Sequence, residues 1–168
     1  MRCTKSARSR LSTALLVGLL TILADQCSKL TALHFLSPGE PVNLIGQVLR
    51  LNLTYNPGMA FGLQVRGVLY LVLLGVFLFL ILMYLVLRRS RSSPAFVVAA
   101  IGLGLGGAVS NLIDRLRLGA VIDYIDLSVW PVFNVADIAL TAAAILLALH
   151  LAVARKSLGD NQVESSEL

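Results

Sequence analysis

Long apolar runs alternate with short charged clusters along the whole chain. A membrane-spanning helix needs roughly 20 mostly apolar residues, and four segments meet this requirement. They cover residues 11–35, 67–87, 92–113 and 133–154. The pattern predicts an all-α integral membrane protein with four transmembrane helices, forming a single domain over residues 1–168.

The basic residues predict how these helices are oriented. Clusters of Arg and Lys precede the first span, separate the second from the third, and follow the fourth. Because basic loops stay on the cytoplasmic side, both termini are predicted to be cytoplasmic. Residues 36–66 and 114–132 are then extracytoplasmic. The polar tail, residues 157–168, is predicted to be disordered.

Composition supports a membrane protein and argues against a nucleic-acid partner. The chain is 57% hydrophobic and only 14% charged, and its mean hydropathy is +0.84. The net charge of +5 comes from clusters between apolar runs, where they act as topology signals. The two cysteines, Cys3 and Cys27, are too few for a disulfide framework and match no metal motif. No metal or other cofactor is expected.

Polar side chains in three of the spans fall at a similar depth. Asp25 lies roughly 21 Å along the first span, because a helix rises about 1.5 Å per residue. Asp137 lies roughly 27 Å outward along the fourth span, and Asn111 roughly 30 Å outward along the third. Since the hydrocarbon core is about 30 Å thick, these residues should meet near its outer boundary.

In each of these three spans, further polar residues lie three or four positions from the first one and so share its helix face, forming a polar stripe. In lipid, such polar stripes should face the bundle interior. Ion pairs near helix ends and a helix-capping role for Asp137 are structural alternatives that spacing leaves open. Glycines in the third span, at 102, 104, 106 and 107, predict close helix packing. The stripes are Asp25 with Lys29, Asn111 with Asp114 and Arg115, and Asn134 with Asp137.

Five short motifs, in this order, resemble the lipoprotein signal peptidase (signal peptidase II) family, the membrane aspartic proteases of bacteria. The family often has glycine where this chain has Ser110, and little effect is expected from that exchange. The motifs are DQCSK at 25–29, NPGMAFG at 56–62, GGAVSNLIDR at 106–115, VIDYI at 121–125 and FNVAD at 133–137.

The resemblance implies an activity and its residues. Such enzymes cleave prolipoproteins just before a diacylglyceryl-modified cysteine, at the extracytoplasmic face of the inner membrane. Lipid-modified prolipoproteins and membrane lipids are therefore the expected partners, and a monomer suffices for the mechanism. The implied catalytic residues are Asp123 and Asp137. The expected substrate-binding or supporting residues are Asp25, Lys29, Asn56, Gly58, Asn111, Asp114, Arg115 and Asn134.

The chemistry can be stated from the residue types. Two carboxyl groups that share a site hold one proton between them, because a second negative charge is disfavoured. One can then activate water while the other polarises the scissile carbonyl. Asp126 is expected to be solvated, whereas Asp123 has apolar neighbours that suit burial. The resemblance also implies a small β-rich extracytoplasmic segment, and residues 48–56 have the required alternation.

Two functions from other classes compete with this one. A small proton-coupled transporter or channel subunit could use Asp25, Asp114 and Asp137 as a proton relay. A relay should continue inward, yet the inner halves of the spans carry no Asp, Glu, Lys or Arg, and His150 is isolated there. A non-catalytic assembly factor would not need two carboxylates at matched depth. A cleavage assay with a lipidated prolipoprotein separates all three.

Overall fold

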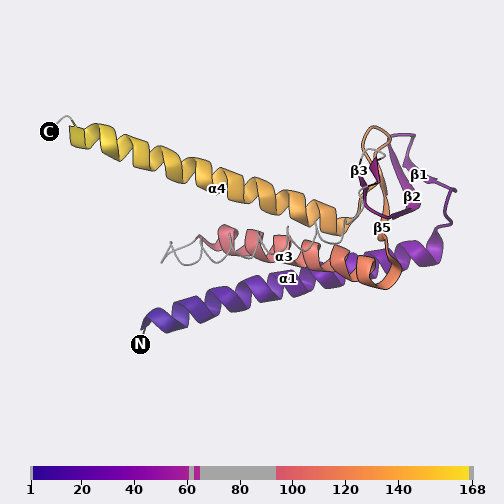
Figure 1. Ribbon diagram of the computed structural model, residues 1–168, viewed down its shortest axis with the longest axis horizontal. Helices are drawn as coiled ribbons and strands as arrows, with labels where there is room; N and C mark the ends of the chain where they lie inside the picture. The colour runs from indigo at the N-terminus through magenta and orange to yellow at the C-terminus, as the bar shows by residue number, and fades with distance from the viewer. Residues whose placement is uncertain (1, 61–62, 65–93, 167–168) are drawn as a thin grey trace.

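The structure is a computed structural model that describes residues 2–60, 63–64 and 94–166. Long helices run beside one another, and a small sheet lies at the end of the bundle opposite both termini (Figure 1). The polar ends of the helices therefore meet the sheet. The elements are α1 (Arg2–Phe35), β1 (Val42–Ile45), β2 (Leu49–Asn56), β3 (Met59–Ala60), β4 (Leu63–Gln64), α3 (Ala95–Leu118), β5 (Val121–Asp126) and α4 (Val135–Ser166).

Among the described residues, three helices are long and apolar enough to cross a membrane. They span Ser9–Phe35, Ala95–Leu118 and Val135–Val153, which correspond to the first, third and fourth predicted spans. The second predicted span, residues 67–87, lies outside the described residues. The four-span count therefore stays a prediction.

Several helix ends differ from the predicted span boundaries, and α1 already begins at Arg2 rather than at residue 11. Helix α3 continues past residue 113 to Leu118. Its C-cap is Gly119, whose φ of 72° is left-handed and whose N–H donates to the Arg115 carbonyl at 3.0 Å. Glycine adopts this backbone conformation without steric cost. Helix α4 continues to Ser166, where a disordered tail was predicted from residue 157. An established helix gains one hydrogen bond for each residue added, and no proline interrupts this segment.

The glycines of α3 bring it into close contact with both neighbouring helices, as predicted. A Cβ added at Gly106 would lie 2.5 Å from the Gly18 carbonyl oxygen of α1. On the other side of α3, a Cβ at Gly107 would lie 2.6 Å from the Ala136 carbonyl oxygen of α4. Only glycine permits such backbone contact. The close packing brings the polar residues of the three helices within hydrogen-bonding distance.

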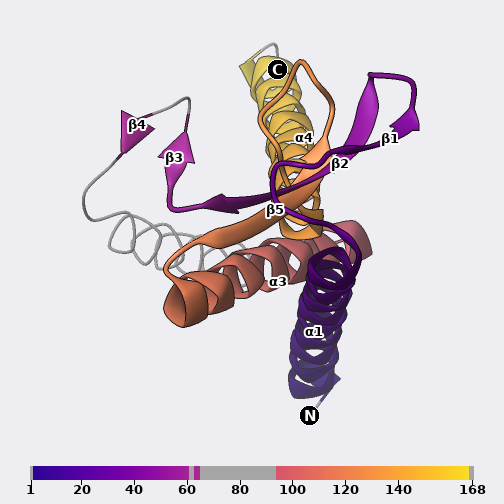
Figure 2. The ribbon, with the colours of Figure 1, turned by 90° about the vertical axis from the view of Figure 1, so that its right-hand side faces the viewer.

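The sheet joins the segment that follows α1 to the segment that follows α3. Strand β2 pairs antiparallel with β1 and with β5, and the strand predicted over residues 48–56 is confirmed as β2. Strand β5 was not predicted from the sequence; it runs beside β2 across the end of the bundle (Figure 2). Its register sets Asp123 opposite Thr54. Strand β5 therefore carries one of the predicted catalytic residues to the ends of the helices.

Candidate active site

All of the predicted site residues belong to one connected network of hydrogen bonds and ion pairs. The network lies where the C-terminal ends of α1 and α3, the N-terminus of α4, and strands β2 and β5 meet. Its connections are buried or half-buried, so each polar group depends on its protein partners rather than on water.

Asp123 lies on β5 and is only 2% exposed. Asn56 Nδ2 donates to Asp123 Oδ2 at 3.0 Å, and Asn134 Nδ2 donates to Oδ1 at 2.7 Å. Burial raises the pKa of Asp123 to about 6; the Asn56 hydrogen bond opposes that rise, and the negative charge of Asp137 adds to it. The Asp123 carboxyl can therefore keep a proton in a pH range where an ordinary aspartate is ionised.

Gly58 fixes the orientation of the Asn56 amide. The Gly58 N–H donates to Asn56 Oδ1 at 3.0 Å, which leaves the Nδ2 group to face Asp123. Gly58 has φ of 99°, a conformation that residues with a Cβ rarely adopt. The glycine of this motif thus serves a geometric purpose.

Asp137 lies in the first turn of α4. Asn111 Nδ2 donates to Asp137 Oδ1 at 2.9 Å, and the Asn134 backbone N–H donates to Oδ2 at 3.2 Å. The Asp137 N–H donates in return to Asn134 Oδ1 at 2.9 Å. This reciprocal pair is a capping box, so the capping alternative is correct in part. Asn134 is the N-cap, and the Asp137 carboxylate accepts the return bond.

Asn134 binds both aspartates at once. Its side-chain amide holds Asp123 and its backbone N–H holds Asp137. The amide also donates to Asn111 Oδ1 at 3.1 Å. One residue therefore fixes the relative position of the two carboxyl groups.

Lys29 of α1 supports this arrangement through three polar contacts. Its ammonium group lies 2.6 Å from Asp25 Oδ2 and 2.6 Å from Asp114 Oδ2, and it donates to Asn111 Oδ1 at 2.9 Å. The residue is 1% exposed. A buried charge needs this kind of pairing to offset its desolvation. The sequence pairing of Asp25 with Lys29 is confirmed, but the ion pair extends to Asp114 on α3.

Both carboxylates of the lysine cluster also position backbone. Asp25 Oδ1 accepts from the Ala136 N–H of α4 at 2.7 Å. Asp114 Oδ2 accepts from the Ile122 N–H of β5 at 3.2 Å. The cluster thereby connects α1 and α3 to the two elements that carry Asp123 and Asp137.

Arg115 lies at the edge of the network. Its Nη1 donates to the Asn111 carbonyl at 3.3 Å, and its charge interacts with those of Asp123 and Asp137. Its Nε is buried and has no hydrogen-bond partner within the part of the chain that the structure describes.

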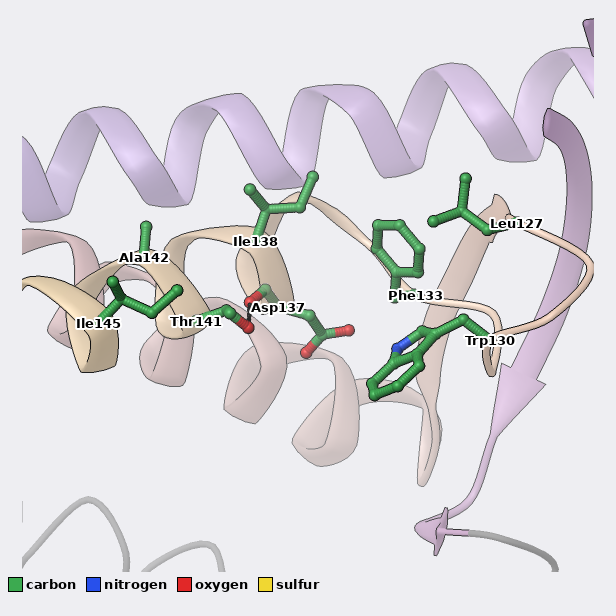
Figure 3. A pocket seen from close by; sticks show the side chains of 8 residues that line it. All are labelled: Leu127, Trp130, Phe133, Asp137, Ile138, Thr141, Ala142 and Ile145. Carbon is green, nitrogen blue, oxygen red and sulfur yellow. Dashed lines mark hydrogen bonds between the residues drawn. The ribbon is translucent and has the colours of Figure 1, made fainter. Parts of the chain in front are cut away.

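A largely apolar pocket of about 470 Å³ opens beside Asp137. Leu127, Trp130 and Phe133 line one part of it, and residues of α4, including Ile138, line another (Figure 3). Asp137 is the one ionisable residue among the described lining residues. An apolar pocket with a single carboxylate suits a hydrophobic ligand that presents a polar group at one point.

Comparison with known proteins identifies the family. The model of the family described as Signal peptidase (SPase) II matches residues 17–153. The chain belongs to this family. The lipoprotein signal peptidase of Halothermothrix orenii is 40% identical over 81% of this chain and 92% of its own. That of Moorella thermoacetica is 38% identical over 82% and 91%.

Solved structures agree with this assignment. Two chains described as a bacterial membrane enzyme are each 28% identical to this chain, with a TM-score of 0.72. They cover 83% of it, and it covers 87% and 92% of them. The protein is therefore a signal peptidase II family peptidase of the membrane. That finding decides against the transporter, channel and assembly-factor alternatives.

The sequence analysis missed two side chains of this signal peptidase II site. Ser110 Oγ donates to Asp25 Oδ2 at 2.7 Å, so the residue that stands in place of the family's glycine has its own contact. Gln26 Nε2 donates to Asp114 Oδ1 at 2.9 Å. Both residues lie inside quoted motifs, but their role depends on how α1 packs against α3.

In the described part of the chain, no group of three or more His, Cys, Asp and Glu residues could hold a metal ion.

Asp126 is not solvated, and that prediction was wrong. The residue is 4% exposed, and its carboxylate binds Arg50 Nη2 at 2.7 Å. The Ser128 backbone N–H lowers the pKa of Asp126; burial opposes this, and Asn52 and Arg50 lower the pKa further. None of these partners contacts Asp137. The partners of the Asp126 carboxylate are therefore an ion pair and hydrogen bonds within the protein; that Asp126 stands outside the catalytic pair stays a prediction.

Proposed function

We propose that this signal peptidase II removes signal peptides from prolipoproteins whose cysteine carries a diacylglyceryl group. It does so by activating a water molecule between Asp123 and Asp137, and the peptide bond that breaks precedes the lipidated cysteine. The observation that carries this proposal is that Asn134 binds both carboxyl groups. Prolipoprotein processing is what the names of the similar proteins imply.

The two aspartates take different parts in the reaction. Asp137 lies in the first turn of α4, where helix N–H groups stabilise a negative charge. We assign it the ionised role, accepting a proton from water. Asp123, with its pKa raised to about 6, holds the proton that polarises the scissile carbonyl. Two coupled carboxyls with one proton can perform both tasks without a metal or a nucleophilic side chain.

The surrounding residues hold the substrate and the pair. The Nε of Arg115, which has no hydrogen-bond partner among the described residues, can bind a substrate backbone carbonyl, and Asn56 orients Asp123. The apolar pocket beside Asp137 suits the hydrophobic segment that precedes the cleaved bond. All of these residues belong to one chain, which supports a functional monomer in contact with membrane lipids.

The test of this function is a comparison of two substrates. The enzyme should cleave a prolipoprotein that carries the diacylglyceryl group, and should cleave the same polypeptide without the lipid at least about 100-fold more slowly. A contribution of this size corresponds to about 3 kcal/mol of binding used in the transition state. Product mass spectrometry should place the cut directly before the cysteine. Equal cleavage of both polypeptides would contradict the proposed substrate class.

The pH dependence tests the shared proton. We expect kcat/KM to fall on the alkaline side with an apparent pKa near or above 6, because a raised pKa keeps Asp123 protonated below that value. This apparent value belongs to the pair. Asn56→Ala should move the alkaline limb of the pH profile to higher pH, because the Asn56 hydrogen bond favours ionised Asp123. An alkaline limb with an apparent pKa below 5, or a shift of that limb to lower pH in Asn56→Ala, would exclude the protonated role of Asp123.

We also propose that both termini are cytoplasmic and that the site lies at the extracytoplasmic face. The basic clusters support this orientation, as does the position of both chain ends opposite the sheet (Figure 1). With Cys3 and Cys27 replaced by serine, Ser157→Cys should react with an impermeant thiol reagent only after the membrane is opened. Glu40→Cys should react in intact cells. The reverse result would invert the topology.

A further inference from the structure

The loop between β5 and α4 forms one wall of the pocket beside Asp137. Leu127, Trp130 and Phe133 line that wall (Figure 3). The far end of the loop is held by paired backbone hydrogen bonds between Ile125 and Phe133. Val129 and Trp130 at its tip are 92% and 63% exposed. The tip therefore adds little packing, and the position of the wall depends on contacts near the start of the loop.

Asp126 makes the main contacts at the start of the loop. Its Oδ1 accepts from the Ser128 N–H at 2.7 Å, while its Oδ2 accepts from Arg50 Nη2 at 2.7 Å and from Asn52 Nδ2 at 3.3 Å. One buried carboxylate thus connects strand β2 to the first turn of the loop.

The backbone at Ser128 needs these contacts. Its φ of 63° is in the left-handed region, which is unfavourable for a residue with a side chain. Its hydroxyl donates to the Gln47 carbonyl in the turn between β1 and β2. The loop therefore leaves β5 in a conformation that its attachment to the sheet maintains.

We propose that the Arg50–Asp126 ion pair is a latch that fixes the pocket wall formed by Leu127, Trp130 and Phe133. The latch sets how tightly the hydrophobic part of the substrate binds. Arg50 and Asp126 are positioning residues, because the hydrogen-bond partners of Asp123 are Asn56 and Asn134. The link to substrate rests on the proposed function, whereas the link to the loop rests on geometry alone.

Trp130 provides a direct readout of the loop, because it is the single tryptophan of the chain. Arg50→Met and Asp126→Ala should each raise acrylamide quenching of its fluorescence by roughly twofold and lower its anisotropy, since the freed loop becomes more mobile. Asn43→Ala is the matched control. Asn43 is exposed and lies opposite Arg50 in the sheet, and its replacement should leave both signals unchanged.

Kinetics on the lipidated substrate provide the second readout. Arg50→Met and Asp126→Ala should each raise KM by about three- to fivefold, as expected for a partly exposed ion pair, with kcat within about twofold. The double variant should be no worse than the more affected single variant, because the two residues act as one unit. Asp126→Asn should show a smaller effect, since its amide oxygen can still accept from Ser128.

The outcomes separate the latch from the proposed function. Unchanged quenching and KM in Arg50→Met and Asp126→Ala, with native circular dichroism, would overturn the latch. A fall in kcat at constant KM would also overturn it, because the pair would then act on the chemical step. If the wild-type enzyme fails to cleave the lipidated substrate, the proposed function fails, while the Trp130 signals still decide the latch.

Discussion

Asparagine in place of either Asp123 or Asp137 should lower kcat by about 10²- to 10⁴-fold, the range that general acid–base groups contribute. An amide has the shape of the carboxyl but can neither accept nor donate the catalytic proton. Both variants should still fold. Asn at position 123 can keep a hydrogen bond within the network, and Asn at position 137 is an acceptable partner in the α4 cap.

The measurement is single-turnover cleavage of one lipidated substrate by purified variants at equal folded concentration. The double variant should be no slower than either single variant, because residues that act as a unit are not additive. Asp126→Asn is the matched control, with the same chemical change on the same strand. It should lose no more than about tenfold in kcat/KM, roughly 1.4 kcal/mol. An active Asp123→Asn beside an inactive Asp126→Asn would move the pair to Asp126 and Asp137.

The sequence was sufficient for the parts of the site that local spacing determines. Counting residues along the helices placed Asp25, Asn111 and Asp137 at one depth. In the structure, Lys29 contacts both Asp25 and Asn111. Asn111 in turn donates to Asp137 and accepts from Asn134. A span boundary and a helical repeat are local properties of the chain, so counting residues was enough. The apolar runs likewise predicted α1, α3 and the membrane part of α4.

The parts that sequence reasoning missed depend on contacts between distant segments. The partner of Asp126 is Arg50, 76 positions away in the chain, and no local pattern identifies such a pair. Strand β5 was missed for the same reason, because its pairing with β2 is equally distant. Its sequence, VIDYID, has no strict alternation. The role of Ser110 emerged only when α3 was packed against α1.

Lys29→Met should destabilise the protein more than any other single change in the network. The methionine side chain fills a similar volume, but Asp25 and Asp114 would lose the ammonium group that lies 2.6 Å from each of them. Removing one partner of a buried ion pair typically costs about 3–5 kcal/mol, because the remaining charge is uncompensated. For a chain of this size, we expect the apparent Tm in detergent to fall by roughly 10 °C.

Two further variants make this expectation specific to charge. Arg117→Met removes one positive charge from an exposed position on α3 and should leave the apparent Tm within about 1 °C, as for most surface changes. Combining Lys29→Met with Asp25→Asn and Asp114→Asn removes the uncompensated carboxylates, and should recover at least half of the lost stability. No recovery in the triple variant would mean that Lys29 acts through packing rather than charge.

Lys29 should also affect catalysis at a distance from the reacting atoms. Its positive charge lowers the pKa of Asp123, against the larger effect of burial. In any Lys29→Met protein that remains folded, the pKa of Asp123 should therefore rise. The alkaline limb of kcat/KM would move to higher pH, because Asp123 would keep its proton over a wider range. A limb that stays in place while stability falls would restrict Lys29 to holding α1 against α3.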